Sequence, residues 1–227
     1  MIRKHIPNAI TCANLFSGCI GIVYAFKGNL EAAAYFVLLS GIFDFFDGFA
    51  ARLLNVKSNI GKELDSLADM VSFGFLPGVV MFQLLAQSDY NSEYSPYFGF
   101  IITVFSALRL AKFNIDTRQT EDFIGLNTPM NTLFIVSLPF IKTDYPAILG
   151  SSALLIGLTA ILSVLLVSEI RIFSMKFGTK GWKNNRLKYL FLLLSVVLVV
   201  ALQFVAVPFI LMLYIGLSIL HFRQIPR

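Results

Sequence analysis

Long runs of apolar residues, separated by short polar breaks, extend over almost the whole chain. Within a run, the apolar positions neither alternate with polar ones nor form a single stripe, so the pattern fits neither a half-buried strand nor an amphipathic surface helix. A run of about 20 apolar residues, rising 1.5 Å per residue, crosses the hydrocarbon core of a bilayer. The pattern therefore predicts an all-α integral membrane protein with about eight transmembrane helices.

The polar breaks set the boundaries of the expected spans. These spans run over about residues 8–26, 30–54, 63–86, 95–113, 130–141, 147–173, 187–205 and 207–222. The fifth span is the weakest by length, and a kink at Pro208 is expected to separate the last two. If these two formed one broken span, the chain ends would lie on opposite sides of the membrane.

The distribution of positive charge supports an even number of spans. With the N-terminus in the cytoplasm, Lys27 and Lys142 fall outside, and all other Lys and Arg residues fall on the inner side. An excess of Lys and Arg is typical of the inner loops of membrane proteins. We therefore expect a multi-pass protein of the cell inner membrane with both termini in the cytoplasm.

Composition favours one membrane-embedded domain over residues 1–227. The chain is 57% hydrophobic and carries a formal net charge of +5. Because the basic residues gather on the inner side, we interpret this charge as anchoring to inner-leaflet lipids and not as nucleic-acid binding. No low-complexity segment, long linker or internal repeat divides the sequence.

Four aspartates lie in the second and third expected spans. Asp44 and Asp47 are three residues apart, and Asp65 and Asp69 are four apart, so each pair shares one helix face. The short connection makes the two helices antiparallel neighbours, which lets the four carboxylates converge. A carboxylate inside a spanning helix costs about 2.5 to 3.5 kcal/mol, so four of them indicate a function.

Converging carboxylates in a low-dielectric environment either take up protons or bind cations. Hard oxygen ligands favour Mg²⁺ or Mn²⁺, and two such ions would balance four negative charges. The alternative is salt bridging between helices, for which Arg52, Lys57 and Lys62 are near, although each of them prefers the interface. We therefore predict two divalent metal ions and phosphoryl-transfer chemistry at an inner-side site.

Residues beside the aspartates suit a phosphorylated nucleotide. Gly48 and Ala51 lie on the stripe of Asp44 and Asp47, where small side chains would let a nucleotide approach the backbone. Arg52 could hold a diphosphate with two hydrogen bonds. Gly61 lies near the start of the third span, where a helix N-terminus attracts anions.

The spacing of these residues resembles the signature of the CDP-alcohol phosphatidyltransferases. The chain reads Asp44-Phe-Phe-Asp47-Gly48-Phe-Ala-Ala51-Arg52, then eight residues, Gly61, three residues, Asp65, three residues and Asp69. Every fixed position of the signature is filled.

This resemblance implies roles for the individual residues. The four aspartates would hold two metal ions, Mg²⁺ or Mn²⁺, and Asp69 would also be the catalytic base that accepts a proton from the acceptor hydroxyl. Gly48, Arg52 and Gly61 would bind the CDP moiety. The family further implies a homodimer and a cavity that faces the cytoplasm and opens sideways to the bilayer.

Segments outside the signature indicate the acceptor alcohol. The opening with Asn8, Thr11 and Asn14 resembles the phosphatidylserine synthases of this superfamily, and it would contribute to binding of CDP-diacylglycerol. The segments 109–114 and 125–131 resemble the same enzymes. The resemblance implies transfer of the phosphatidyl group from CDP-diacylglycerol to L-serine, giving phosphatidylserine and CMP.

A serine acceptor brings a carboxylate that needs a cationic partner. Arg109 or Lys112 could pair with it, and Asn114 could supply a polar contact. Alternatively, Arg109 and Lys112 only anchor the inner surface. In the same way, Asn8, Thr11 and Asn14 either bind the nucleotide or only cap and pack the first helix.

Other functions fit parts of the pattern. The same chemistry with glycerol 3-phosphate or inositol phosphate as acceptor would call for more basic residues near the cavity. A divalent-cation transporter also places aspartates within its spans. Such a transporter needs no arginine beside its acids, and polar residues would continue to the outer side, whereas the second and third spans are almost wholly apolar beyond Asp44 and Asp69.

Overall fold

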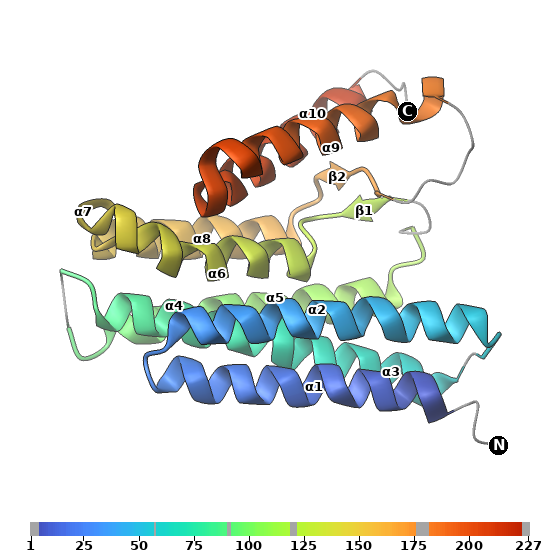
Figure 1. The fold of residues 1–227 in the computed structure, drawn as a ribbon, viewed down its shortest axis with the longest axis horizontal. Coiled ribbons are helices and arrows are strands. Elements are labelled where there is room, and N and C mark those ends of the chain that lie inside the picture. Colours follow the sequence, from blue (N-terminus) through green and yellow to red (C-terminus); the bar gives the residue numbers. More distant parts are fainter. Residues whose placement is uncertain (1–4, 57, 90–91, 119–121, 176–181, 224–227) are drawn as a thin grey trace.

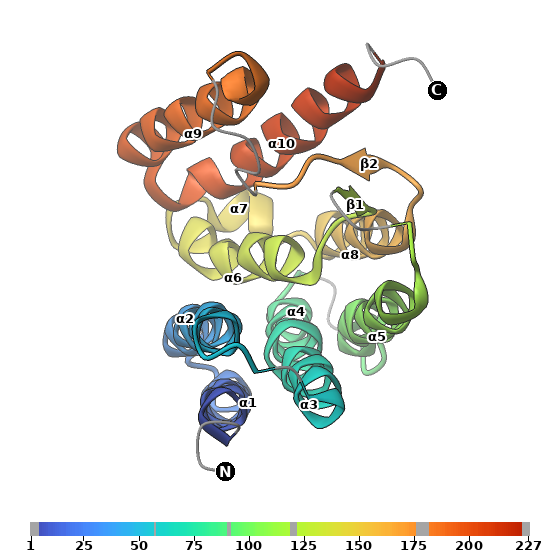
Figure 2. The same cartoon turned by 90° about the vertical axis from the view of Figure 1, so that its right-hand side faces the viewer.

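Helices stacked in layers build the protein (Figures 1 and 2). This computed structural model describes residues 5–56, 58–89, 92–118, 122–175 and 182–223. The first layer contains α1 (His5–Phe26), α2 (Leu30–Leu53), α3 (Asn59–Asp69), α4 (Leu76–Ala86) and α5 (Phe100–Ile115). The middle layer contains α6 (Thr128–Asp144), the short α7 (Pro146–Leu149) and α8 (Ser152–Val167). The last layer contains α9 (Trp182–Leu202) and α10 (Ala206–Arg223).

The protein is mostly helical and has the character of a transmembrane protein, as predicted. Stretches long and apolar enough to cross a membrane within the described chain are His5–Phe26, Leu30–Leu53, Asn59–Ala86, Ser95–Ile115 and Asn185–Arg223. The first four coincide with the first four predicted spans. Large apolar side chains such as Phe16, Phe45 and Val200 are exposed on these helices, which suits contact with lipid.

The basic residues that the sequence predicts on the inner side are only partly described. Those that lie outside the described part of the chain are Arg3, Lys4, Lys57, Lys176, Lys180 and Arg227. Figure 1 shows that α1 begins at the end of the bundle where α2 ends and α3 begins. The opposite end carries the turn between α1 and α2 and the helix α7.

A π-helical turn, Met70–Phe75, joins α3 to α4, so one continuous rod extends from Asn59 to Ala86. A π turn displaces backbone carbonyls from regular α-helical bonding, and such turns often occur at functional sites. Here the Thr132 hydroxyl donates to the Phe73 carbonyl at 2.8 Å, and the Thr103 hydroxyl donates to the Gly74 carbonyl at 3.1 Å. Side chains from α6 and α5 therefore fix the turn that directly follows Asp69.

Close packing of α1 against this rod depends on glycine. A Cβ at Gly18 would lie 2.3 Å from Oγ of Ser72, and one at Gly21 would lie 2.7 Å from Cδ2 of Leu76. Both distances are shorter than a van der Waals contact. Small residues at these positions let α1 approach the helix that carries Asp69.

The predicted sixth span, residues 147–173, is not one helix. It divides into α7, α8 and an extended segment that ends in the strand β2 (Arg171–Ile172). The polar residues Ser168, Glu169 and Arg171 interrupt the apolar run, and the backbone N–H of Leu126 donates to the Leu165 carbonyl at the end of α8. Helix α8 is 16 residues long. At 1.5 Å per residue, it is shorter than a typical hydrocarbon core of about 30 Å.

A small β-ribbon corrects the expectation of a purely α-helical fold. The strand β1 (Phe123–Ile124) pairs with β2 in antiparallel fashion, with Phe123 opposite Ile172 and Ile124 opposite Arg171. The ribbon joins the loop before α6 to the segment after α8 (Figure 2). Strands of two residues lie below the length that periodicity detects.

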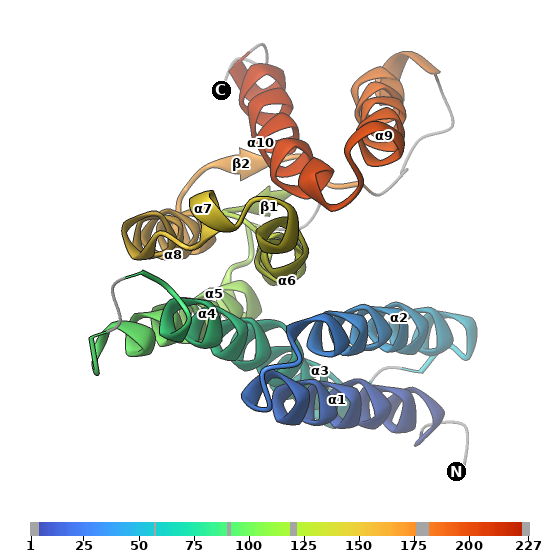
Figure 3. The same cartoon turned by 60° about the vertical axis from the view of Figure 1, so that its left-hand side comes forward.

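The last two predicted spans correspond to two helices, α9 and α10, but the position and cause of the break between them differ from the prediction. The chain reverses at a 3₁₀ turn, Gln203–Val205, in which Gln203 has a positive φ of 49°. Pro208 lies in the first turn of α10, where proline is tolerated because the first N–H groups of a helix have no intrahelical partner. The turn folds α10 back beside α9 (Figure 3).

Candidate active site

The carboxylates of α2 and α3 converge as predicted. One oxygen from each of Asp44, Asp47 and Asp65 lies within 4.8 Å of the other two. Asp69, the last residue of α3, is outside this group of three, but it lines one cavity together with Asp44 and Asp65. The four acidic groups thus form one continuous cluster between two adjacent helices.

The turn between α2 and α3 sets the register of this cluster. Asn55 has a positive φ of 52°, a conformation that asparagine tolerates better than most residues, and it reverses the chain after α2. Ser58 then caps α3, since its hydroxyl accepts a hydrogen bond of 2.9 Å from the N–H of Gly61. A Cβ at Gly61 would lie 2.8 Å from that hydroxyl oxygen and 3.0 Å from Oδ1 of Asn8. Glycine therefore permits close contact among the cap, α1 and α3.

Polar side chains of α1 contact the acidic cluster. The Thr11 hydroxyl donates a 2.6 Å hydrogen bond to Oδ2 of Asp47, and the Asn14 side-chain amide donates a 3.4 Å bond to Oδ1 of Asp69. The hydroxyls of Ser40 and Ser72 both donate to the backbone carbonyl of Asn14 at 3.2 Å. The first helix is therefore hydrogen-bonded to both acidic helices.

The cluster has the donor set of a divalent-cation site. Among the described residues, no Lys or Arg forms an ion pair with any of the four aspartates. The side-chain oxygen of Asn14, next to Asp69, is buried with no hydrogen-bond donor. Interhelical salt bridging therefore does not explain the carboxylates within the described chain. Clustered carboxylate oxygens are the ligands that hard cations prefer, so these residues fit a metal ion.

A cavity of about 470 Å³ lies on one side of the cluster, between the start of α1, the end of α2 and the start of α3. Its lining includes Asn8, Thr11, Gly48 and Gly61, together with Asp47 and Asp65. Asn14 and Arg52 are not among the lining residues. The Nη1 atom of Arg52 lies 3.9 Å from where a Cβ of Gly48 would stand, so the guanidinium is close to the cavity. We call this space the nucleotide cavity, because several of its lining residues are predicted from the sequence to bind CDP.

A second cavity, of about 340 Å³, lies on the other side of the cluster. It is lined by Asp44, Asp65 and Asp69, by residues 109–114 of α5 in part, and by the loop before α6. Arg109 and Asn114 are lining residues, whereas Lys112 is not. We call this space the acceptor cavity, because Arg109 and Asn114 are predicted from the sequence to contact the acceptor.

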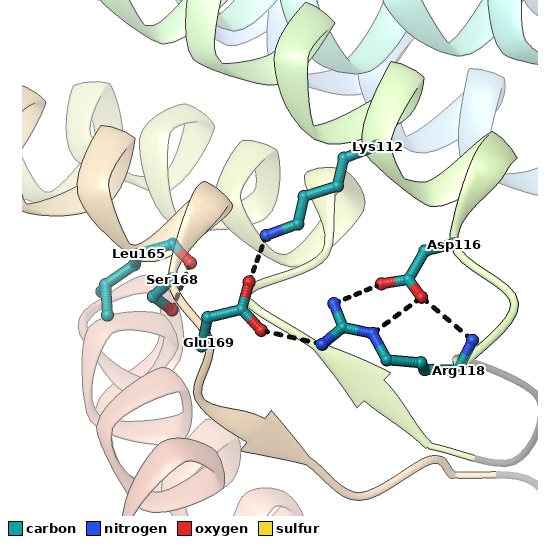
Figure 4. Close-up of polar contacts among 6 residues, drawn as sticks. All are labelled: Lys112, Asp116, Arg118, Leu165, Ser168 and Glu169. Atoms are coloured by element: carbon teal, nitrogen blue, oxygen red, sulfur yellow. Dashed lines mark hydrogen bonds and ion pairs between the residues drawn. The ribbon is translucent and has the colours of Figure 1, made fainter.

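The polar residues of α5 have different partners. The Arg109 Nε donates a 3.2 Å hydrogen bond to the Leu126 carbonyl, and the residue is only 3% exposed. The Asn114 side-chain amide donates a 2.8 Å bond to the Ser66 hydroxyl. The Lys112 ammonium forms an ion pair with Glu169, beyond the end of α8 (Figure 4).

Sequence reasoning missed a third cavity, of about 350 Å³, that adjoins Asp44 between α2 and α6. Apolar residues including Ile42, Phe45, Phe46 and Leu133 line it. In the sequence these residues are indistinguishable from side chains that face lipid, so no signal marked them. Ser66 and Phe123 line the acceptor cavity but were not predicted, because nothing in the sequence connects them with Arg109.

Comparison with known proteins agrees with this site. The family model described as CDP-alcohol phosphatidyltransferase matches residues 4–166. A CDP-diacylglycerol–serine O-phosphatidyltransferase of Bacillus subtilis (strain 168) is 36% identical over 172 residues, which cover 74% of this chain and 89% of the relative. A protein of the same name from Helicobacter pylori (strain J99 / ATCC 700824) is 34% identical over 169 residues, covering 73% and 70%.

An archaeal relative extends the comparison. The archaetidylserine synthase of Methanothermobacter thermautotrophicus is 30% identical over 167 residues, which cover 73% of this chain and 68% of the relative. The family match includes all four aspartates, the glycines of the nucleotide cavity and the α5 residues of the acceptor cavity. The chain belongs to the CDP-alcohol phosphatidyltransferase family.

Proposed function

We propose that this protein transfers the phosphatidyl group from CDP-diacylglycerol to L-serine, releasing CMP and forming phosphatidylserine. The observation that carries the proposal is the position of the acidic cluster between two polar cavities, of which one borders Asp47 and the other borders Asp69. A donor nucleotide and an acceptor alcohol bound in these cavities would meet at the carboxylates.

The nucleotide cavity would hold the CDP moiety. Gly48, Ala51 and Gly61 leave its walls free of bulky side chains, and Asn8 and Thr11 offer polar contacts. Arg52, one turn after Gly48 on α2, would reach the diphosphate. The third cavity would take an acyl chain of the same substrate, because it is lined by apolar residues and adjoins Asp44.

The acidic cluster would act on both substrates. Asp44, Asp47, Asp65 and Asp69 would hold two divalent ions, Mg²⁺ or Mn²⁺. The chemistry these ions supply when bound is neutralisation of charge on the diphosphate. Asp69 borders the acceptor cavity but not the nucleotide cavity, which supports its assignment as the base.

The transfer itself is a single displacement. The acceptor hydroxyl gives its proton to a carboxylate oxygen of Asp69, and the hydroxyl oxygen forms a bond to the β-phosphorus. The bond between that phosphorus and the oxygen of CMP breaks, and its electron pair leaves with CMP. Asn14 donates a hydrogen bond to Asp69 and so orients the carboxylate toward the acceptor.

Serine is the acceptor that the combined observations favour. The names of the bacterial relatives specify serine, and the archaeal relative is a synthase of a serine lipid. In the acceptor cavity, Arg109 would pair with the serine carboxylate, and Asn114 would supply a polar contact. Glycerol 3-phosphate and inositol phosphate are the alternative acceptors.

The cellular arrangement follows from the same proposal. We place the chain in the cell inner membrane as a single domain of eight spans, with both termini and the active site facing the cytoplasm and with two copies forming a homodimer. The concentration of Lys and Arg in the loops that we assign to the inner side supports this orientation.

The experiment that tests the function measures CMP release by purified protein in detergent, with CDP-diacylglycerol and Mg²⁺ or Mn²⁺. Serine, glycerol 3-phosphate, inositol and inositol phosphate are compared as acceptors. Release that depends on serine alone is the expected result, and EDTA should stop it reversibly. Release with a different acceptor would overturn the assignment of serine, and no release with any acceptor would favour the transporter hypothesis.

A further inference from the structure

The loop that forms one wall of the acceptor cavity is hydrogen-bonded to the end of α8 and to the segment that follows it. This wall, residues 123–129, has only two residues of regular structure before α6 begins. We call residues 165–174 the clamp segment. Beyond the β-ribbon, the Gly125 N–H donates to the Ile170 carbonyl at 2.8 Å, and the Leu126 N–H donates to the Leu165 carbonyl at 2.9 Å.

The wall packs closely against the clamp segment. Gly125 has a φ of 78°, and a Cβ there would lie 2.7 Å from the Leu166 carbonyl oxygen and 2.8 Å from that of Ser168. Asp122, just before the wall, accepts a 3.1 Å hydrogen bond from the Ser174 N–H. A displacement of the clamp segment would therefore carry the wall with it.

Helix α5 contacts both the wall and the clamp segment. Arg109 donates to the Leu126 carbonyl in the wall, and Lys112, one turn later, pairs with Glu169 in the clamp segment (Figure 4). The other carboxylate oxygen of Glu169 lies 3.5 Å from Nη1 of Arg118, which is itself paired with Asp116 at 2.9 Å. Glu169 thus links the clamp segment to Lys112 on α5 and to Arg118 just after α5.

The Lys112–Glu169 ion pair connects two segments that are distant in the sequence. The side chains of Lys112 and Glu169 are 35% and 61% exposed, and exposed ion pairs contribute little to overall stability. However, the pair joins positions 57 residues apart and completes a ring of contacts: α5, wall, clamp segment and α5 again. Without it, the ring depends on neutral hydrogen bonds between the wall and the clamp segment.

We propose that Glu169 is a positioning residue for the acceptor, which acts by holding the clamp segment against Lys112 and thereby the cavity wall against Arg109. This inference rests on the proposed function, because it assigns the loop wall to the acceptor and not to the nucleotide. Glu169 lies beyond the 4–166 region that the family model matches, so the family signature does not include it.

The test compares Glu169→Gln with the wild type in the CMP-release assay. Serine is titrated at saturating CDP-diacylglycerol, and CDP-diacylglycerol is titrated at saturating serine. The serine KM should rise about three- to fivefold, the effect expected for loss of an exposed ion-pair network. The kcat and the KM for CDP-diacylglycerol should stay within about twofold, because the nucleotide cavity does not contact the clamp segment.

A matched control removes the same charge elsewhere. Glu63 is an exposed glutamate on α3 that does not line either polar cavity. Glu63→Gln should leave both KM values unchanged. A general effect of inner-surface charge would instead shift the serine KM equally in the two variants and would overturn the inference.

A charge exchange separates positioning from loss of folding. Lys112→Glu and Glu169→Lys should each raise the serine KM, and the double variant should return it to within about threefold of the wild type, since the ion pair is re-formed. If Glu169→Gln does not fold, the serine KM of the double variant tests the positioning role in its place. Failure of both to fold, or a double variant no better than the single ones, would overturn the inference.

The proposed function and this inference fail in different ways. A wild type that releases no CMP with serine contradicts the function, and the same titrations are then made with the acceptor that is active. A wild type that uses serine, beside a folded Glu169→Gln variant with an unchanged serine KM, contradicts the positioning role alone.

Discussion

The Thr11 hydroxyl on α1 donates a 2.6 Å hydrogen bond to Oδ2 of Asp47 on α2. Both residues are buried, with exposed fractions of 3% and 6%. A hydrogen bond to a charged group contributes about 1.5–3 kcal/mol, more than a neutral pair. The first helix therefore orients the acidic cluster in addition to lining the nucleotide cavity.

Replacing this hydroxyl should weaken metal binding. In Thr11→Val, which keeps the shape of the side chain, the concentration of Mg²⁺ or Mn²⁺ that gives half-maximal CMP release should rise about tenfold, because partners that orient metal ligands typically change affinity by 10–100-fold. Thr11→Ser keeps the hydroxyl and serves as the control. Equal metal requirements in the two variants would contradict the role of this bond.

Asp69→Asn should abolish transfer while the protein still folds, because an amide of similar volume replaces the proposed base. CMP release is the measurement, and size-exclusion chromatography in detergent checks folding. Asp144→Asn, at the exposed end of α6, is the matched control and should retain full activity. Turnover above about a tenth of the wild type in Asp69→Asn would exclude this carboxylate as the general base.

Gly61→Ala should raise the KM for CDP-diacylglycerol. The added Cβ would lie 2.8 Å from the Ser58 hydroxyl oxygen and 3.0 Å from Oδ1 of Asn8, so the cap of α3 or the Asn8 side chain must shift at the wall of the nucleotide cavity. A rise of about tenfold corresponds to a loss of about 1.4 kcal/mol.

Gly157→Ala provides the control for this glycine prediction, because a Cβ there meets no atom within 4 Å. It should leave the KM for CDP-diacylglycerol unchanged and, as a helical Gly-to-Ala change in α8, should not lower stability. If Gly61→Ala also leaves this KM unchanged, the crowding at Asn8 does not reach the substrate.

The sequence predicts the positions of the first four long helices well, because each of these apolar runs has the length of a span and polar residues end it. It also predicts the convergence of the aspartates, since intervals of three and four residues place each pair on one helix face and the short connection makes the two helices neighbours. These features depend on local pattern alone.

Features that depend on tertiary contacts could not be predicted in this way. At the end of α8, the Leu165 carbonyl accepts a hydrogen bond from Leu126, some 40 residues earlier, and an isolated apolar run does not show this contact. The partner of Lys112 could equally be lipid, substrate or protein until Glu169 is placed beside it. The reversal at Gln203 depends on a positive φ, for which glutamine gives no signal.

Arg109→Ala should raise the serine KM more than the KM for CDP-diacylglycerol. The guanidinium lines the acceptor cavity and also supports the Leu126 carbonyl in its wall, so both the acceptor contact and the wall are affected. Arg109→Lys keeps the charge but not the planar group that can bind a carboxylate with two hydrogen bonds. We expect an intermediate KM for it. Equal effects on both substrates would indicate a purely structural arginine.

The ion pair of Glu169 predicts how the effect of its removal depends on pH. The hydrogen bond from Lys112 lowers the pKa of the Glu169 carboxyl below its usual value of 4.5. A carboxylate with a lowered pKa contributes fully above its unfolded value, and its contribution is lost only as the pH falls through the folded value. From about pH 6 to about pH 8, Glu169 is therefore ionised throughout. The ratio of serine KM between Glu169→Gln and the wild type should stay constant over this range.

The same titration has a clear contrary outcome. Each serine KM is measured by CMP release at half-unit steps of pH, with Glu63→Gln as the control for changes of surface charge. Any pH dependence that Glu169→Gln and the wild type share then arises from serine or from the acidic cluster, and it cancels in the ratio of their KM values. If the ratio instead falls toward one between about pH 8 and about pH 6, a group that titrates near neutrality, and not the Glu169 carboxylate, holds the clamp segment.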